Sequence, residues 1–131
     1  ELETLRDAQK EFAAAVDKGD AMEIAQTDER FHEIIYAGTK NQKLMQILSN
    51  LREQMYRYRL EYIKDANKRH VLLVEHEQIL KALSLRHVQE AKLAIREHID
   101  NQEITVLKNL KEQENDVQRK VSGRRNRVRG D

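Results

Sequence analysis

The stretch Thr27–Tyr36 carries a carboxylate and an imidazole that can act together. Asp28 and His32 are four residues apart in a segment with helical patterning. This spacing places two side chains on one helix face, with Cβ atoms about 5–6 Å apart. Ala25 and Ile35 extend the same face, which is otherwise apolar. A charged aspartate directed into a core must be paired, hydrogen-bonded or bound to a metal, so the two side chains can share one ion.

Two further histidines lie on the inward faces of other predicted helices. Of the five histidines, His32, His76 and His98 fall on three separate apolar stripes. A lone histidine on such a face is more often a hydrogen-bonded core residue, but three of them with Asp28 favour a metal. Three imidazoles and one carboxylate suit Zn²⁺, Ni²⁺, Mn²⁺ or Fe²⁺ better than Ca²⁺. The spacing leaves both interpretations open, a four-ligand metal site and a set of core histidines.

Helical periodicity explains the elements that would position these residues. The pattern predicts helices over residues 2–16, 21–37, 41–62 and 69–83, and a last one from residue 88 onward. Gly19-Asp20, Gly38, residues 65–68 and residues 84–87 are the predicted breaks. His70 and His87 fall at helix ends, off the inward stripes, and we expect both to be solvent-exposed or capping.

Composition narrows the class of protein. A chain of 131 residues fits one domain with a modest core, and a net charge of +1 singles out neither nucleic acid nor an acidic substrate. Cysteine is absent, which excludes disulfides and thiolate metal sites. There is neither an apolar run long enough to cross a bilayer nor a signal-peptide pattern. We therefore expect a soluble, cytoplasmic protein without a membrane partner, and a first residue, Glu1, that marks a piece of a longer chain.

The C-terminal part is polar and becomes strongly basic. Apolar content fades after Leu110, and five of the eleven residues from Arg119 to Arg129 are arginine. The composition predicts a disordered or frayed tail over residues 113–131. A contact with nucleic acid or acidic lipid is the sharper alternative.

Catalytic motifs are missing around the candidate ligands. In the metalloprotease motif H-E-x-x-H a second histidine follows the first by four residues. His32-Glu33 is followed by Tyr36 instead, and His76-Glu77 by Leu80. The sequence also lacks a phosphate loop, a nucleophile elbow and paired Glu-x-x-His motifs. We predict that the chain is not an enzyme, with a mononuclear metal-dependent hydrolase or oxygenase as the alternative.

Several short motifs, in this order, resemble one known family. They are Gly19-Asp20, Asp28-Glu29-Arg30-Phe31-His32, Asn41-Gln42-Lys43-Leu44, Glu75-His76-Glu77-Gln78-Ile79 and Arg96-Glu97-His98-Ile99. The chain is similar, over roughly residues 1–110, to the FCD ligand-binding domain at the C-terminus of GntR-type bacterial transcription regulators. Leu85-Arg86-His87 departs from the Gly-Asp that the family often has between its last two helices.

The resemblance implies an all-α fold, an antiparallel helical bundle with a central metal and effector cavity. It implies a divalent metal, zinc in first place and nickel, manganese or iron otherwise, on four residues: Asp28, His32, His76 and His98. The effector would be a small organic acid. Its candidate binding residues are Arg52, Arg59, Tyr58 and Gln102, and a surface salt bridge is the alternative for either arginine.

The resemblance also implies how the domain would act. Residues 1–112 would form the effector-binding domain, without its first helix, and a homodimer would contact DNA only through an absent N-terminal winged helix-turn-helix domain. A metal-free helical interaction module remains as a further alternative.

Overall fold

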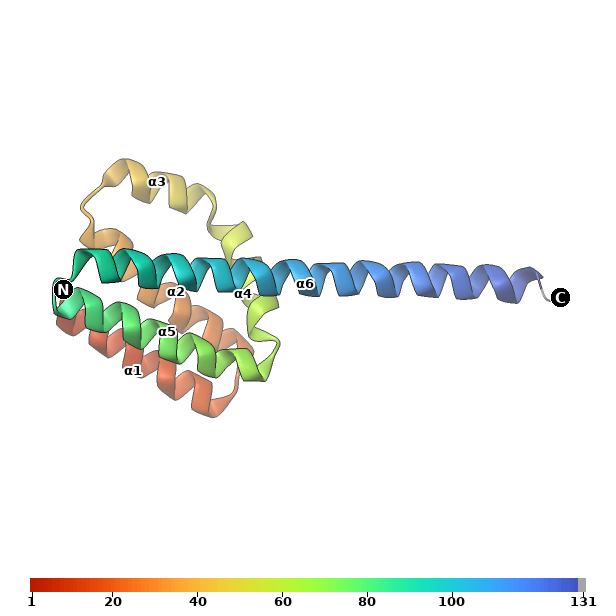
Figure 1. The fold of residues 1–131 in the computed structure, drawn as a ribbon, viewed down its shortest axis with the longest axis horizontal. Helices are drawn as coiled ribbons and strands as arrows, with labels where there is room; N and C mark the ends of the chain where they lie inside the picture. Colours follow the sequence, from red (N-terminus) through yellow and green to blue (C-terminus); the bar gives the residue numbers. More distant parts are fainter. Residues whose placement is uncertain (130–131) are drawn as a thin grey trace.

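The computed structural model describes residues 1–129 and contains six α-helices in that range. They are α1 (Leu2–Lys18), α2 (Ala21–Gly38), α3 (Gln42–Asn50), α4 (Arg52–Ile63), α5 (Ala66–Ser84) and α6 (Val88–Arg129). This confirms the predicted all-α class. In Figure 1, α1, α2 and α5 lie together below α6, while α3 stands apart above it.

Local capping explains most of the boundaries. Gly19 has φ 83° and ends α1 in the left-handed conformation that glycine adopts without a Cβ penalty. The Asp20 side chain then accepts a hydrogen bond of 3.0 Å from the N–H of Met22 and starts α2. Asp65 caps α5 in the same way, so that α5 begins at Ala66, three residues before the predicted Arg69.

Gly19 gives a simple stability prediction. We expect Gly19→Ala to lower the free energy of unfolding by about 1–2 kcal/mol, since the left-handed conformation costs an L residue that much. No atom lies within 4 Å of the added Cβ, so backbone strain alone would act. Urea unfolding measures the change. Gly38→Ala is the control, because Gly38 has ordinary helical φ and equally open space.

The predicted helix over residues 41–62 is wrong in one respect, because the chain breaks at Leu51. The N–H of Leu51 bonds to the carbonyl of Leu48, and its φ and ψ are −95° and −1°. The 4-3 apolar spacing continues through the break, but α3 has no buried residue and Leu51 itself is exposed. Nothing therefore holds the two segments in one line. The break redirects α4 so that it packs against α2 and α6.

Two apolar clusters form the core, and the candidate ligands lie between them. The first consists of Phe12, Ala15, Val16, Ile24, Ala25, Tyr62, Ile63, Leu72 and Val106. The second consists of Leu5, Ala8, Phe31, Ile79 and Leu80. The ring of His76 contacts both, with centroids 4.6 Å from Phe12 and 4.2 Å from Phe31.

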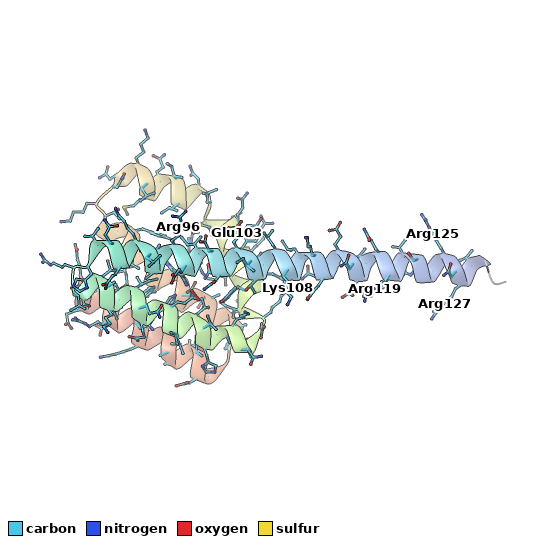
Figure 2. All side chains as sticks on the ribbon, viewed as in Figure 1. Arg96, Glu103, Lys108, Arg119, Arg125 and Arg127 are labelled. Atoms are coloured by element: carbon cyan, nitrogen blue, oxygen red, sulfur yellow. The ribbon has the colours of Figure 1, made fainter. Side chains whose placement is uncertain are left out.

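Helix α6 projects well beyond the bundle (Figures 1 and 2). Within the described residues, its most C-terminal hydrogen bond to the bundle runs from Gln113 Nε2 to Glu61 Oε1, at 2.8 Å. The helix nevertheless continues to Arg129, which corrects the predicted disordered or frayed tail. The segment contains no proline, and its lysine, arginine, glutamate and glutamine residues are good helix formers. Among the described helices, none is long and apolar enough to cross a membrane.

Candidate metal centre

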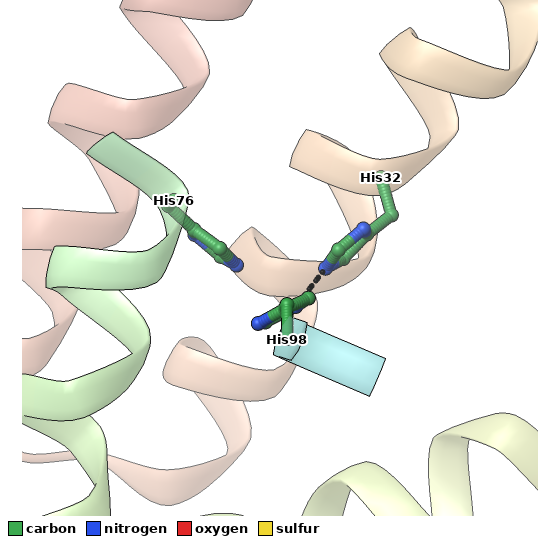
Figure 3. A group of neighbouring side chains, drawn as sticks. All are labelled: His32, His76 and His98. Atoms are coloured by element: carbon green, nitrogen blue, oxygen red, sulfur yellow. Dashed lines mark hydrogen bonds between the residues drawn. The ribbon is translucent and has the colours of Figure 1, made fainter. Parts of the chain in front are cut away.

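Three histidines from three helices converge inside the bundle (Figure 3). His32 comes from α2, His76 from α5 and His98 from α6, and one ring nitrogen of each lies within 4.8 Å of the others. The Nε2 atoms of His32 and His98 are 3.2 Å apart. Two nitrogens bound to one ion by bonds of about 2.0–2.1 Å are themselves about 3.0–3.4 Å apart. The spacing therefore suits neighbouring ligands of one metal.

Asp28 lies beside two of these histidines. Its Oδ1 atom is 3.0 Å from Nε2 of His76 and 3.5 Å from Nε2 of His32. Asp28 is fully buried, and its other oxygen, Oδ2, accepts a hydrogen bond from Nε of Arg59 on α4. The i, i+4 spacing of Asp28 and His32 thus brings both to one centre, while the contact with Arg59 holds the carboxylate in place.

Gln9 on α1 determines which nitrogen of His76 faces the centre. Nε2 of Gln9 donates to Glu77 Oε1 at 3.1 Å and to the carbonyl of Leu73 at 3.4 Å. Oε1 of Gln9 therefore faces Nδ1 of His76, at 3.2 Å, and accepts a hydrogen bond from its N–H. The neutral His76 ring then has its free lone pair on Nε2, directed at Asp28.

Glu75 plays the same part for His98. Its Oε2 atom accepts from Nδ1 of His98 at 3.3 Å and from Asn101 Nδ2 at 3.4 Å. Nε2 of His98 therefore presents a lone pair to the centre. Metal-binding histidines commonly donate their second N–H to a carboxylate or carbonyl partner, which fixes the ring. Gln9 and Glu75 supply such partners here.

The protonation states of His76 and Asp28 determine what the centre can offer to a cation. Burial lowers the pKa of His76 to about 4, although Asp28 acts in the opposite direction, so the ring is neutral at pH 7. Burial alone would raise the pKa of Asp28, but His32 and His76 hold it well below its usual range. Asp28 Oδ1 and His76 Nε2 lie 3.0 Å apart in the buried interior, and neither atom has a hydrogen-bond partner in the described chain. A cation between them would satisfy both.

A groove between α4 and α6 lies next to this centre. It has a volume of about 330 Å³ and is lined by Met55, Tyr58, Arg59, Ile99, Gln102, Glu103, Val106, Leu107 and Leu110. Three of the four candidate effector residues, Tyr58, Arg59 and Gln102, thus line one groove. Arg52 does not. It is largely exposed and pairs with Glu29 on the bundle surface.

Two further histidines lie outside the centre, and two polar residues that support it were not predicted. His70 and His87 are exposed, as predicted. Sequence reasoning missed Gln9 and Glu75. Glu75 had a signal in the Glu75-His76 pair, where two polar residues interrupt an apolar stripe. No sequence signal pointed to Gln9, because its partner His76 is 67 residues away along the chain.

The all-helical bundle with buried histidine and carboxylate side chains at its centre defines a class, a helical domain with a candidate metal centre inside it. The chain matches the FCD domain over residues 1–101. It therefore belongs to the FCD domain family, the C-terminal regulatory ligand-binding domain of GntR-family regulators. No curated protein and no solved structure matches the chain.

Proposed function

We propose that this chain is the metal-dependent, effector-sensing domain of a cytoplasmic GntR-type transcription regulator. The observation that carries the proposal is the convergence of His32, His76 and His98 beside two buried atoms without hydrogen-bond partners, Asp28 Oδ1 and His76 Nε2, which lie 3.0 Å apart. A divalent transition metal, zinc in first place, would be held by Asp28, His32, His76 and His98. Nickel, manganese and iron are the alternatives, since the order of affinity for such ligands does not alone select the metal.

The proposed effector is a small organic acid. When bound, the metal would supply open coordination positions for a carboxylate. In the groove, Arg59 contributes a positive charge, while Tyr58 and Gln102 contribute a hydroxyl and an amide. A volume of about 330 Å³ is at the lower end for ligand pockets, about 300–1,000 Å³. This supports a small metabolite as the effector. Arg52 is our weakest effector candidate, because Glu29 already engages it.

The proposed output is a change in DNA binding by an N-terminal domain of the full regulator, which would act as a homodimer. We assign effector sensing to residues 1–112. Family membership supports a regulatory role over catalysis.

Metal content tests the proposal directly. We expect about one divalent ion per chain in protein purified without chelator, measured by elemental mass spectrometry. Removal by EDTA should lower the melting temperature by about 10 °C, because a ligand at 1,000 times its Kd contributes about 4 kcal/mol of stability. Restoring Zn²⁺ should restore the melting temperature. Metal-free protein with a melting temperature unaffected by both EDTA and added Zn²⁺ would refute the metal-dependent part.

A substitution at Gln9 tests whether its hydrogen bond with His76 supports metal binding. We expect Gln9→Leu to weaken Zn²⁺ affinity about 10-fold, since partners of metal-binding histidines contribute about 10–100-fold. Gln9→Glu keeps an acceptor for His76 Nδ1 and should lose less. Competition with a chromophoric chelator measures both affinities, and equal losses in the two variants would contradict this role of Gln9.

A further inference from the structure

The projecting part of α6 carries a regular seam of side chains. Six positions follow the 4-3-4-3-4 spacing of a coiled-coil heptad: Leu110, Glu114, Val117, Val121, Arg124 and Val128. The four apolar members are between 41% and 80% exposed. Figure 2 shows that the part of α6 that carries Arg119, Arg125 and Arg127 extends away from the bundle. From Val117 onward, the apolar positions of the seam thus have no partner in the described chain.

The seam is symmetric about residue 119. Leu110 and Val128 are equally far from that point, and so are Val117 and Val121. The two polar members, Glu114 and Arg124, are also equidistant from it, and their charges are opposite. Reversing the direction of the helix therefore exchanges apolar with apolar positions and acidic with basic ones.

We propose that this segment of α6 pairs antiparallel with the same segment of a second copy of the chain. In that register Leu110 faces Val128, Val117 faces Val121, and Glu114 faces Arg124 of the other copy, twice each by symmetry. The six layers extend over about 27 Å at 1.5 Å per residue. A parallel, in-register pair would instead place Glu114 against Glu114 and Arg124 against Arg124, and like charges in a seam repel.

The charged residues beside the seam also favour antiparallel pairing. Residues 111–116 hold three carboxylates and one lysine, whereas residues 119–129 hold six lysines and arginines and no acidic residue. Antiparallel pairing lays residues 111–116 along residues 122–127 of the other copy. Parallel pairing would align the two basic ends, where repulsion is greatest.

A partner would stabilise this segment of the helix. An internal glycine costs a helix about 1 kcal/mol. Residues 114–129 lie beyond the last bundle contact and include Gly123 and three valines, which are modest helix formers. Burial of the valines against a second copy would stabilise the helix that the structure contains.

This inference rests on the proposed function only in giving the proposed homodimer a surface. It does not involve the metal, and among the seam residues only Leu110 also lines the groove proposed for the effector. The basic end of α6 has a competing explanation, contact with a polyanion such as nucleic acid, and the experiment must separate the two.

Charge reversal across the seam provides the test, with sedimentation equilibrium of the 131-residue chain as the measurement. We expect a concentration-dependent dimer. Glu114→Arg and Arg124→Glu should each weaken it at least tenfold, because each places two like-charge pairs in the seam. The combined variant should recover to within a few-fold, since the opposite charges face each other again. Glu112→Arg, on the helix face away from the seam, is the matched control and should change the dimer little.

Disulfide trapping measures the direction of the pair. Because the chain has no cysteine, Leu110→Cys and Val128→Cys each introduce a single thiol. Oxidation of an equimolar mixture should give mainly the mixed disulfide between the two variants. Homodisulfides of each variant would indicate parallel pairing and overturn the proposal.

Three other results would also overturn it. They are a chain that stays monomeric at several hundred micromolar, a dimer that both single reversals leave intact, and reversals that alter retention on heparin without altering mass. The second would leave a homodimer through another surface, and the third would assign the basic end to a polyanion. Metal content and EDTA sensitivity remain separate, so failure here does not refute the sensor proposal.

Discussion

His76→Ala is expected to lower Zn²⁺ affinity by about 100-fold or more. Loss of an outer partner alone costs about 10–100-fold, and loss of a ligand should cost at least as much. His76 is fully buried, and its Nε2 atom has no hydrogen-bond partner in the described chain, so no other side chain would replace it. Isothermal titration with Zn²⁺, or competition with a chelator, measures the loss.

Two controls separate this loss from unfolding. Far-ultraviolet circular dichroism should retain the helical content of the variant. His70→Ala removes an exposed histidine and should leave Zn²⁺ affinity unchanged. If His76→Ala and His70→Ala had the same affinity as the unsubstituted protein, the buried histidines would be core residues, as the metal-free interpretation holds.

Phe31→Ala is expected to destabilise the metal-free protein by about 3–5 kcal/mol. Phe31 is fully buried, belongs to the cluster with Leu5 and Ile79, and stacks on His76 at 4.2 Å with ring planes 11° apart. Alanine would remove that contact and leave a cavity, which costs about this much for a phenylalanine in a core. Such a loss is a large part of the stability of a domain.

Urea unfolding in EDTA measures the effect of Phe31 apart from the metal. Phe31→Leu keeps most of the volume and should cost less than half as much. Met22→Ala, at an exposed position, should change stability by no more than about 0.5 kcal/mol. A change below about 1 kcal/mol for Phe31→Ala would contradict the packing described for His76.

Helix type and most boundaries could be predicted because their causes are local. Gly19 and Asp20 end one helix and start the next through their own backbone and side chain. The break at Leu51 could not be predicted, since the apolar spacing runs through it without interruption and only the lack of a packing surface under α3 distinguishes it. The basic end of α6 was mistaken for a frayed tail because polar composition was given more weight than helix propensity.

The candidate metal ligands could be predicted better than the contacts that hold them in place. Periodicity placed His32, His76 and His98 on inward faces, and the structure brings them together. Arg59 was predicted to bind an effector, whereas its nearest partner is Asp28. Contacts of this kind depend on the relative heights of helices that are distant in sequence, which periodicity does not specify.

The double role of Arg59 has a thermodynamic consequence. It contacts Asp28 Oδ2 and also lines the adjacent groove. An anion in the groove would compete with the carboxylate for the guanidinium and so alter the negative charge available to the ion. By reciprocity, any factor by which such a molecule tightens or loosens the proposed metal ion must reappear as the factor by which that ion changes the molecule's own dissociation constant.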